Sequence, residues 1–160
     1  MWYDLPSINV GRYYHASCTF NDRYVFVFCG ITLPSKKYSN TVEKYDNEKR
    51  SPWQELTFRT NELPDRQGAG VSQINENEII IFGGFSGRFL TDSYLLDVPS
   101  GKIRKTSKPP QYELFAFQMP TVYDPKTGTI VTADWQNRKI YSYEYEGEWK
   151  MIKDLKGGKA

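Results

Sequence analysis

Apolar residues in this 160-residue chain occur in short runs separated by turn-forming residues. The runs Tyr24–Phe28 and Glu78–Phe82 are almost continuously β-branched or aromatic, and each is too short for a helix. They predict strands that are buried on both faces. Residues 41–45 and 139–145 mix apolar with polar positions, which predicts strands nearer the surface. No segment combines helical periodicity with start and stop signals, so the expected fold is all-β.

These runs return in the same order almost three times. The distance from Arg12 to Arg66 is 54 residues, and Gly30 and Gly84 are separated by the same distance, which is typical of a repeat that forms one blade of a propeller. The third copy lacks the leading arginine and the glycine pair. The residues that mark the repeat are Arg12, Arg66, Gly30, Gly83, Gly84, Tyr45, Asp46, Asp97, Trp2, Trp53 and Trp149.

Four strands per copy, joined by short turns, predict a four-stranded antiparallel sheet for each repeat. We expect one propeller segment over residues 1–160, with its sheets at 12–56, 66–106 and 118–152. Trp2 begins a short stretch similar to the one that Trp53 begins, so residues 1–6 predict the outer strand of a preceding sheet. Residues 153–160 are expected to form a flexible tail.

Three features occur in a fixed order: glycines ending the second strand, an aspartate ending the third, and a tryptophan opening the fourth. In this order they resemble the kelch-repeat β-propeller family. The resemblance implies a partial kelch-type propeller of three blades plus one extra outer strand. The chain departs from the pattern at Cys29 and at Ala133-Asp134, where glycines are replaced. Closed propellers usually have four to eight blades, so we expect either a segment of a longer propeller or one part of an assembly.

Composition limits the classes of partner. The formal net charge is +2, so bulk attraction to nucleic acid or to a membrane is not expected. No apolar stretch is long enough to span a bilayer, and the amino terminus lacks a secretory signal, which together favour the cytoplasm. A hairpin turn would place Cys18 opposite a residue near Phe26. A disulfide between Cys18 and Cys29 is therefore not expected, as in a reducing compartment.

Catalytic chemistry has few candidates. His15 is the single histidine, and it lies three residues from Cys18, on the opposite face of a strand. Residues 84–87 superficially resemble a nucleophile elbow but lack the helix that must follow one. We therefore predict no catalytic site, no cofactor and no metal site.

Antiparallel strands alternate in direction, so two kinds of connection leave each blade on one face. These are the second-to-third strand connections and the connections between blades. They are long and aromatic, and they carry eight basic against three acidic residues, whereas the opposite face carries four against eight. Aromatic residues and arginine are enriched at protein interfaces, so this face predicts the docking site of a protein with an acidic segment. The predicted partner-binding residues are Tyr13, Lys36, Lys37, Tyr38, Phe85, Arg88, Phe89, Tyr112, Phe115, Trp135 and Arg138.

Two functions remain open. The first is a non-catalytic protein-interaction scaffold, which the family resemblance also implies, with Arg12 and Arg66 bracing the loops. The alternative is a subdomain of a kelch-like propeller enzyme, a lyase or a sugar-converting enzyme. The alternative requires five side chains to converge on a central channel: Arg12, Tyr14, His15, Arg66 and Gln118. Scattered orientations would favour the scaffold.

Overall fold

The computed structural model describes residues 2, 4–57, 63–106 and 119–155 of the chain. These residues form strands, turns and loops, and none of them is helical. The all-β fold expected from the short apolar runs is confirmed. Within the same residues no helix is long and apolar enough to cross a bilayer.

Three sheets have four antiparallel strands each, paired in chain order, and we call them blades 1 to 3. Blade 1 consists of β2 (Ala16–Phe20), β3 (Tyr24–Phe28), β6 (Val42–Asp46) and β7 (Gln54–Leu56). Blade 2 consists of β8 (Gly70–Gln73), β9 (Glu78–Phe82), β10 (Ser93–Asp97) and β11 (Lys102–Lys105). Blade 3 consists of β12 (Thr121–Asp124), β13 (Thr129–Asp134), β14 (Lys139–Glu144) and β15 (Trp149–Asp154). The expectation of one four-stranded antiparallel sheet for each repeat is thus confirmed.

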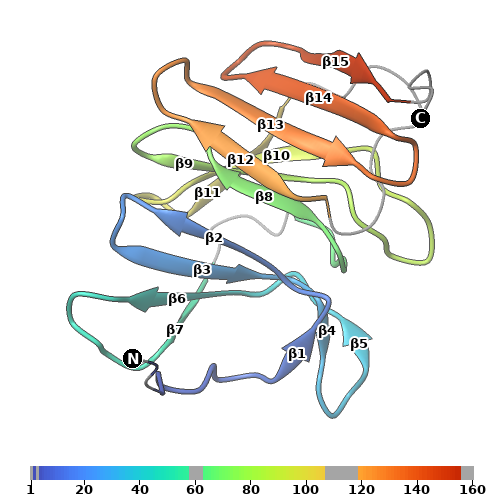
Figure 1. Cartoon of the computed structure of the whole chain (residues 1–160). Coiled ribbons are helices and arrows are strands. Elements are labelled where there is room, and N and C mark those ends of the chain that lie inside the picture. Colours follow the sequence, from blue (N-terminus) through green and yellow to red (C-terminus); the bar gives the residue numbers. More distant parts are fainter. Residues whose placement is uncertain (1, 3, 58–62, 107–118, 156–160) are drawn as a thin grey trace.

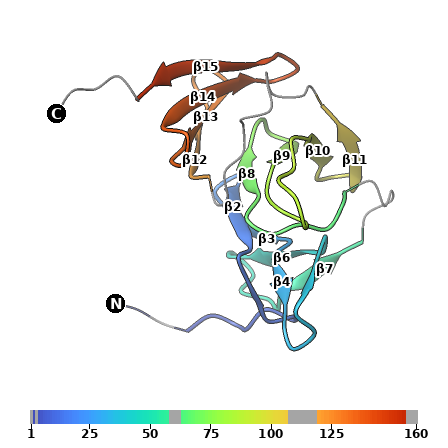
Figure 2. The same cartoon turned by 90° about the vertical axis from the view of Figure 1, so that its right-hand side faces the viewer.

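The blades follow one another from bottom to top in Figure 1. Turned by 90°, they form a fan in which the first strands β2, β8 and β12 lie together and the fourth strands β7, β11 and β15 lie apart (Figure 2). Both β2 and β12 contact β8. The side of the fan beyond the first strands is open in Figure 2.

The hydrophobic core lies between the blades. Ile79 and Ile81 of β9 pack against blade 1, whereas Ile80 and Phe82 pack against blade 3, because side chains alternate between the two faces of a strand. This explains why the sequence of β9 is apolar at consecutive positions. The ring of Trp149 lies 4.8 Å from that of Phe82, so the indole fills the gap between blades 2 and 3.

A pair of residues with positive φ ends the second strand of blades 1 and 2. Gly83 and Gly84 have φ values of 59° and 93°, and the corresponding Cys29 and Gly30 have 58° and 92°. The repeat therefore keeps its backbone path even where cysteine replaces glycine. A Cβ atom at Gly84 would lie 2.6 Å from the carbonyl oxygen of Gln67, so glycine is needed there for space as well as for conformation.

Two predicted boundaries are wrong. Residues 2 and 4–6 form no strand, because an outer strand needs the third strand of its own blade as a hydrogen-bonding partner and no described residue supplies one. Residues 153 and 154 belong to β15 and not to a tail, since Lys153 pairs with Ile140 and Asp154 with Lys139 beyond a register shift. Leu155, also assigned to the tail, donates its backbone N–H to the carbonyl oxygen of Arg138 at 2.7 Å. Residues 156–160 lie outside the described residues.

The hairpin of β2 and β3 has the register that its turn predicts. Cys18 lies opposite Phe26, and both cysteines are free thiols. Burial raises the pKa of Cys18 to about 12, and burial likewise raises the pKa of Cys29 to about 12. Thiolate is the reactive form, so both thiols are protected from alkylation in the folded state.

The substitution Gly84→Ala should destabilise the fold by about 3 kcal/mol, because it combines a strained φ with overpacking against the backbone. Gly87→Ala is a matched control, since Gly87 has a φ of 71° but nothing within 4 Å of an added Cβ atom. It should cost about 1 kcal/mol. Urea denaturation measures both values. Equal losses for the two variants would contradict a close backbone approach at Gly84.

Iodoacetamide at neutral pH should leave both thiols of the folded protein unmodified over a time that fully alkylates the protein in denaturant. Intact mass spectrometry counts the added groups. Rapid native modification of Cys29 would show that the second-strand end of blade 1 opens readily.

Candidate protein-interaction surface

Loops and turns occupy opposite sides of the blades. We call the described residues 6–14, 31–40, 63–67, 85–91 and 135–138 the loop rim, which lies on the right in Figure 1. The short turns between first and second strands and between third and fourth strands form the turn rim, on the left in Figure 1. The loop rim is the face predicted to bind a partner.

A small sheet organises the part of the loop rim that belongs to blade 1. It consists of β1 (Arg12–Tyr13), β4 (Ile31–Thr32) and β5 (Lys37–Tyr38), and it is not among the predicted elements. Tyr13 pairs with Ile31, which pairs in turn with Tyr38. One signal in the sequence could have predicted this hairpin. A pair of one apolar and one polar residue stands on each side of the turn that contains Pro34 and Ser35, namely Ile31-Thr32 and Lys37-Tyr38.

The loop of blade 2 is equally well ordered. Phe85 forms β-bridges with both Gln67 and Phe89. The N–H of Leu90 donates a hydrogen bond to the carbonyl oxygen of Gly84 at 2.9 Å. Backbone hydrogen bonds therefore hold the loop against the connection that precedes blade 2.

A buried arginine anchors the loop rim to blade 1. The Nη1 group of Arg12 donates to the carbonyl oxygens of Cys29 and Thr41 at 2.9 and 3.2 Å. Its Nη2 group lies 2.8 Å from Oε1 of Glu43, and neither side chain of this ion pair is more than 1% exposed. Glu43 also accepts from the backbone N–H groups of Asn9 and Val10 at 2.7 and 3.2 Å.

Arg66 makes the equivalent contacts in blade 2. Its Nη1 group donates to the carbonyl oxygen of Gly83 at 3.0 Å and to Oδ1 of Asp92 at 2.8 Å. The guanidinium also lies over the ring of Tyr94, 5.2 Å from its centroid. Burial, followed by the hydrogen bond to Asp92, raises the pKa of Tyr94 to about 12. We call each arginine with its carboxylate partner a brace.

Aromatic side chains gather on the braced loops. The rings of Tyr38 and Phe85 are 6.4 Å apart, and those of Phe85 and Phe89 are 5.4 Å apart. Tyr13 and Tyr14 form a separate edge-to-face pair at 5.2 Å. Phe89 is 55% exposed although it is apolar and held by neighbouring rings. Such a side chain offers a rigid apolar contact to a partner.

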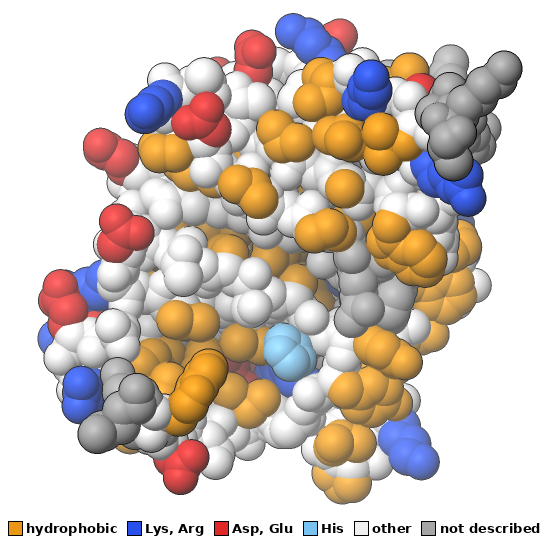
Figure 3. All heavy atoms as spheres, viewed as in Figure 1, with side chains coloured by type: hydrophobic (Ala, Val, Ile, Leu, Met, Phe, Trp, Pro, Cys, Tyr) orange, Lys and Arg blue, Asp and Glu red, His pale blue; other side chains and the backbone are white. Residues whose placement is uncertain are grey.

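The charge of the loop rim is positive where it is accessible. Because Arg12 and Arg66 are buried in braces, they do not contribute to it. The exposed cations are Lys36, Lys37, Arg88 and Arg138, and among the described residues of this rim Asp65 is the one exposed acid. Acidic side chains instead gather along the left of Figure 3, over the turn rim.

The structure places most predicted partner-binding residues at the surface, and two lie outside the described residues, Tyr112 and Phe115. Tyr38 and Phe85 are half-buried beneath Phe89 and its neighbours. The exposed members are Tyr13, Lys36, Lys37, Arg88, Phe89, Trp135 and Arg138. Trp135 and Arg138 lie on the four-residue turn between β13 and β14, so blade 3 contributes no long loop here. Sequence reasoning missed Leu33, which is exposed at the tip of the small sheet.

The aspartates at strand ends serve as turn caps. Asp46 accepts from the backbone N–H groups of Glu48 and Lys49, and Asp134 accepts from that of Asn137. A hydrogen bond from Arg23 holds the pKa of Asp46 at about 2. Hydrogen bonds within the turns therefore account for both carboxylates.

A groove of about 490 Å³ follows the first strands, and polar uncharged side chains such as Ser17, Ser72 and Thr121 line much of it. His15 lines an adjoining pocket of about 250 Å³ together with Met119. Within the described residues, no three His, Cys, Asp or Glu side chains are grouped so that they could hold a metal ion.

The four described side chains that the enzyme alternative requires do not converge in this groove. Arg12 and Arg66 are committed to braces, and Tyr14 is exposed on the loop rim. Gln118 lies outside the described residues. His15 is the one member of the set that lines the pocket.

No protein-family model matches this chain, and no curated protein matches it. Its own surface geometry is therefore the basis on which a function can be assigned. That geometry combines ordered loops, exposed aromatic rings and a local positive charge.

The substitution Arg12→Met should lower the free energy of unfolding by about 3–5 kcal/mol, because it leaves the Glu43 carboxylate buried without its cation. The double variant Arg12→Met/Glu43→Leu should recover part of that loss. Recovery should be incomplete, since the carbonyl oxygen of Cys29 loses the guanidinium donor, whereas that of Thr41 keeps the backbone N–H of Cys29 at 2.9 Å. Urea denaturation of the four species of this double-mutant cycle measures the coupling. Additive effects would contradict the brace.

Proposed function

We propose that this chain is a non-catalytic interaction scaffold, a kelch-type propeller segment that binds a protein partner through its loop rim. The observation that carries the proposal is the set of exposed rings on hydrogen-bonded loops, with Phe89 as its most prominent member. Exposed aromatic residues on an ordered surface are unusual unless they are covered in a complex.

Order in the loops supports tight binding. Association costs free energy wherever loops and side chains must be immobilised, so loops already fixed by hydrogen bonds reduce that cost. Tyr13 and Tyr38 stand on the small sheet, and Phe89 is bridged to Phe85. Their rings provide the kind of anchor that dominates binding energy at protein interfaces.

The charge of the loop rim supports an acidic segment in the partner. Lys36, Lys37 and Arg88 surround the aromatic residues and are exposed. Exposed charges mainly steer association and exclude partners of like charge, so a partner with Asp or Glu beside an apolar anchor is favoured. A net charge of +2 gives no comparable support for nucleic acid or a membrane. Free thiols at Cys18 and Cys29 favour a reducing compartment such as the cytoplasm.

The scattered placement of Arg12, Tyr14, His15 and Arg66 favours the scaffold over the propeller-enzyme alternative. General acid-base catalysis requires groups that converge on one bound molecule. The groove along the first strands has room for a small ligand, but the side chains named for chemistry point elsewhere, apart from His15.

A phage library of random peptides selected on the immobilised chain tests the proposal. We expect enrichment of peptides that carry Asp or Glu beside an aromatic or aliphatic residue. The variant Lys36→Glu/Lys37→Glu/Arg88→Glu should lose binding of the enriched peptides by more than about tenfold, because like charges then face each other. Biolayer interferometry with synthetic peptides measures the affinities.

The matched control reverses charge on the turn rim, with Lys49→Glu/Lys126→Glu. Both lysines are exposed, and this variant should keep its affinity for the same peptides. Phe89→Ser should weaken binding without changing its dependence on salt, since it removes an apolar contact and no charge. If the triple variant binds as tightly as the original chain, the loop rim is not the docking surface.

A further inference from the structure

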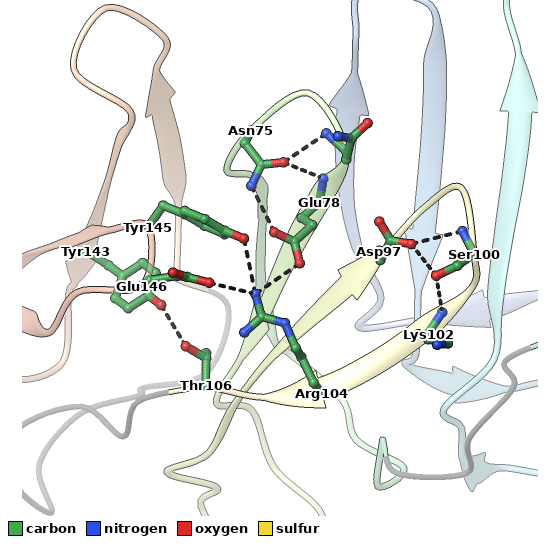
Figure 4. A network of polar contacts seen from close by, with 11 residues as sticks. Asn75, Glu78, Asp97, Ser100, Lys102, Arg104, Thr106, Tyr143, Tyr145 and Glu146 are labelled. Carbon is green, nitrogen blue, oxygen red and sulfur yellow. Dashed lines mark hydrogen bonds and ion pairs between the residues drawn. The ribbon is translucent and has the colours of Figure 1, made fainter.

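Contacts between blades 2 and 3 show what a completed blade interface looks like in this protein. Tyr143 and Trp149 stack with ring centroids 5.1 Å apart. The hydroxyl of Tyr143 lies 2.7 Å from Oγ1 of Thr106, at the end of the outer strand of the preceding blade (Figure 4). On the turn rim, Nη2 of Arg104 reaches across to the hydroxyl of Tyr145 at 3.2 Å. Blade 3 therefore presents an aromatic pair and a tyrosine hydroxyl to the blade before it.

Blade 1 has the same pair on the face that points away from blade 2. Tyr45 and Trp53 stack at 5.3 Å with an interplanar angle of 34°, close to the 36° of the pair in blade 3. Tyr45 is 1% exposed, yet its hydroxyl has no hydrogen-bond partner among the described residues. In blade 3 the equivalent hydroxyl is satisfied by the preceding blade. A buried hydroxyl without a partner is costly, and the partner that Tyr45 lacks is the kind of group that the preceding blade supplies to Tyr143.

The connection leading into blade 1 supports the same interpretation. Arg12 Nε donates to the carbonyl oxygen of Val10, as Arg66 Nε donates to that of Pro64. The second of these segments runs between two blades, where Leu63 is buried in their shared core. The segment that contains Val10 follows the same path over blade 1. No described blade covers the side of this segment that points away from blade 1.

Blade 3 exposes a complementary face. Val122 is 69% exposed and lies opposite Val131 on the side of the sheet that points away from blade 2. Ile140 pairs with Ala133 on the same side. Figure 3 shows hydrophobic side chains gathered over the upper part of the molecule, where blade 3 lies in Figure 1. The corresponding faces of blades 1 and 2 are covered by the next blade.

We propose that a second copy of this chain covers both faces, with blade 3 of each copy docking on blade 1 of the other. The free face of blade 1 and the free face of blade 3 are different surfaces of one chain. A twofold axis along the centre of the fan therefore creates two identical contacts between the copies, and these two contacts close the ring. Three blades from each of two copies give six, within the range of closed propellers. Figure 2 shows the open side of the fan that the second copy would occupy.

Charge at the outer edges fits this arrangement. Lys150 lies opposite Ser142, and Lys153 lies opposite Ile140, so both project from the free side of blade 3. Glu55 lies opposite Glu43 on the free side of blade 1, and it is exposed. Lys150 is paired with Glu144 at 4.0 Å, so Lys153 is the lysine that docking brings toward Glu55. Docking the free face of blade 1 on its own copy would instead bring two glutamates together.

Sedimentation velocity of the full chain across the micromolar range tests the proposal. We expect a species of twice the 18.6 kDa chain mass. Val122→Glu should raise the dissociation constant more than about tenfold by placing a charge on the face of blade 3 that meets the other copy, beside the groove along the first strands. Thr19→Glu, an exposed position on the free face of blade 1, should do the same. Leu33→Glu is the control, because Leu33 is exposed on the loop rim, and it should stay dimeric.

Mixing the Val122→Glu and Thr19→Glu variants distinguishes head-to-tail docking from docking of like faces. One of the two contacts in the mixed pair is then intact, so partial dimerisation should return. A monomer at all concentrations, a species larger than two copies, or a dimer unaffected by Thr19→Glu would each overturn the proposal. Peptide binding at the loop rim is a separate measurement, and its result does not depend on this one.

Discussion

The buried guanidinium at the start of each of the first two repeats is the interaction on which the loop rim depends. Where the second strand ends, the positive-φ pair turns the chain and leaves carbonyl oxygens that no ladder bond can satisfy. Arg12 supplies a donor to the carbonyl oxygen of Cys29, and Arg66 supplies one to that of Gly83. The guanidinium is the one side chain that can donate several hydrogen bonds in fixed directions while it is paired with a carboxylate.

Blade 3 shows what happens without a brace. It has no leading arginine, Ala133 and Asp134 remain within β13, and the next strand begins after four residues. Asp134 caps that short turn through Asn137. The two blades with a brace are also the two whose loops carry Tyr38, Phe85 and Phe89. Long binding loops and buried arginines are therefore parts of one arrangement, in which stability at the base of the loop permits exposure of aromatic rings at its tip.

Much of the fold follows from the sequence because local rules and the repeat agree. Strand order, the opposition of Cys18 to Phe26 and the separation of loops from turns depend only on short apolar runs and on turn positions. The partners of the arginines could not be predicted in this way. Val42 and Ser93 hold equivalent places, yet the carboxylate comes from Glu43 after the first and from Asp92 before the second. The two repeats thus keep an ion pair at the same place in space, although its carboxylate stands at different positions along the strand. An alignment of the two repeats by sequence position therefore does not show the pair.

The small sheet β1-β4-β5 was hidden for a related reason, since two-residue strands have no periodicity to detect. In the proposed docking surface this sheet fixes the directions of Tyr13 and Tyr38. These side chains lie at one end of the fan axis, whereas the free faces of blades 1 and 3 flank the axis. The proposed partner site and the proposed contact between two copies therefore lie on separate surfaces. A ring of two copies would present the loop rim twice on one side, so a partner with two acidic segments would gain from simultaneous engagement of both.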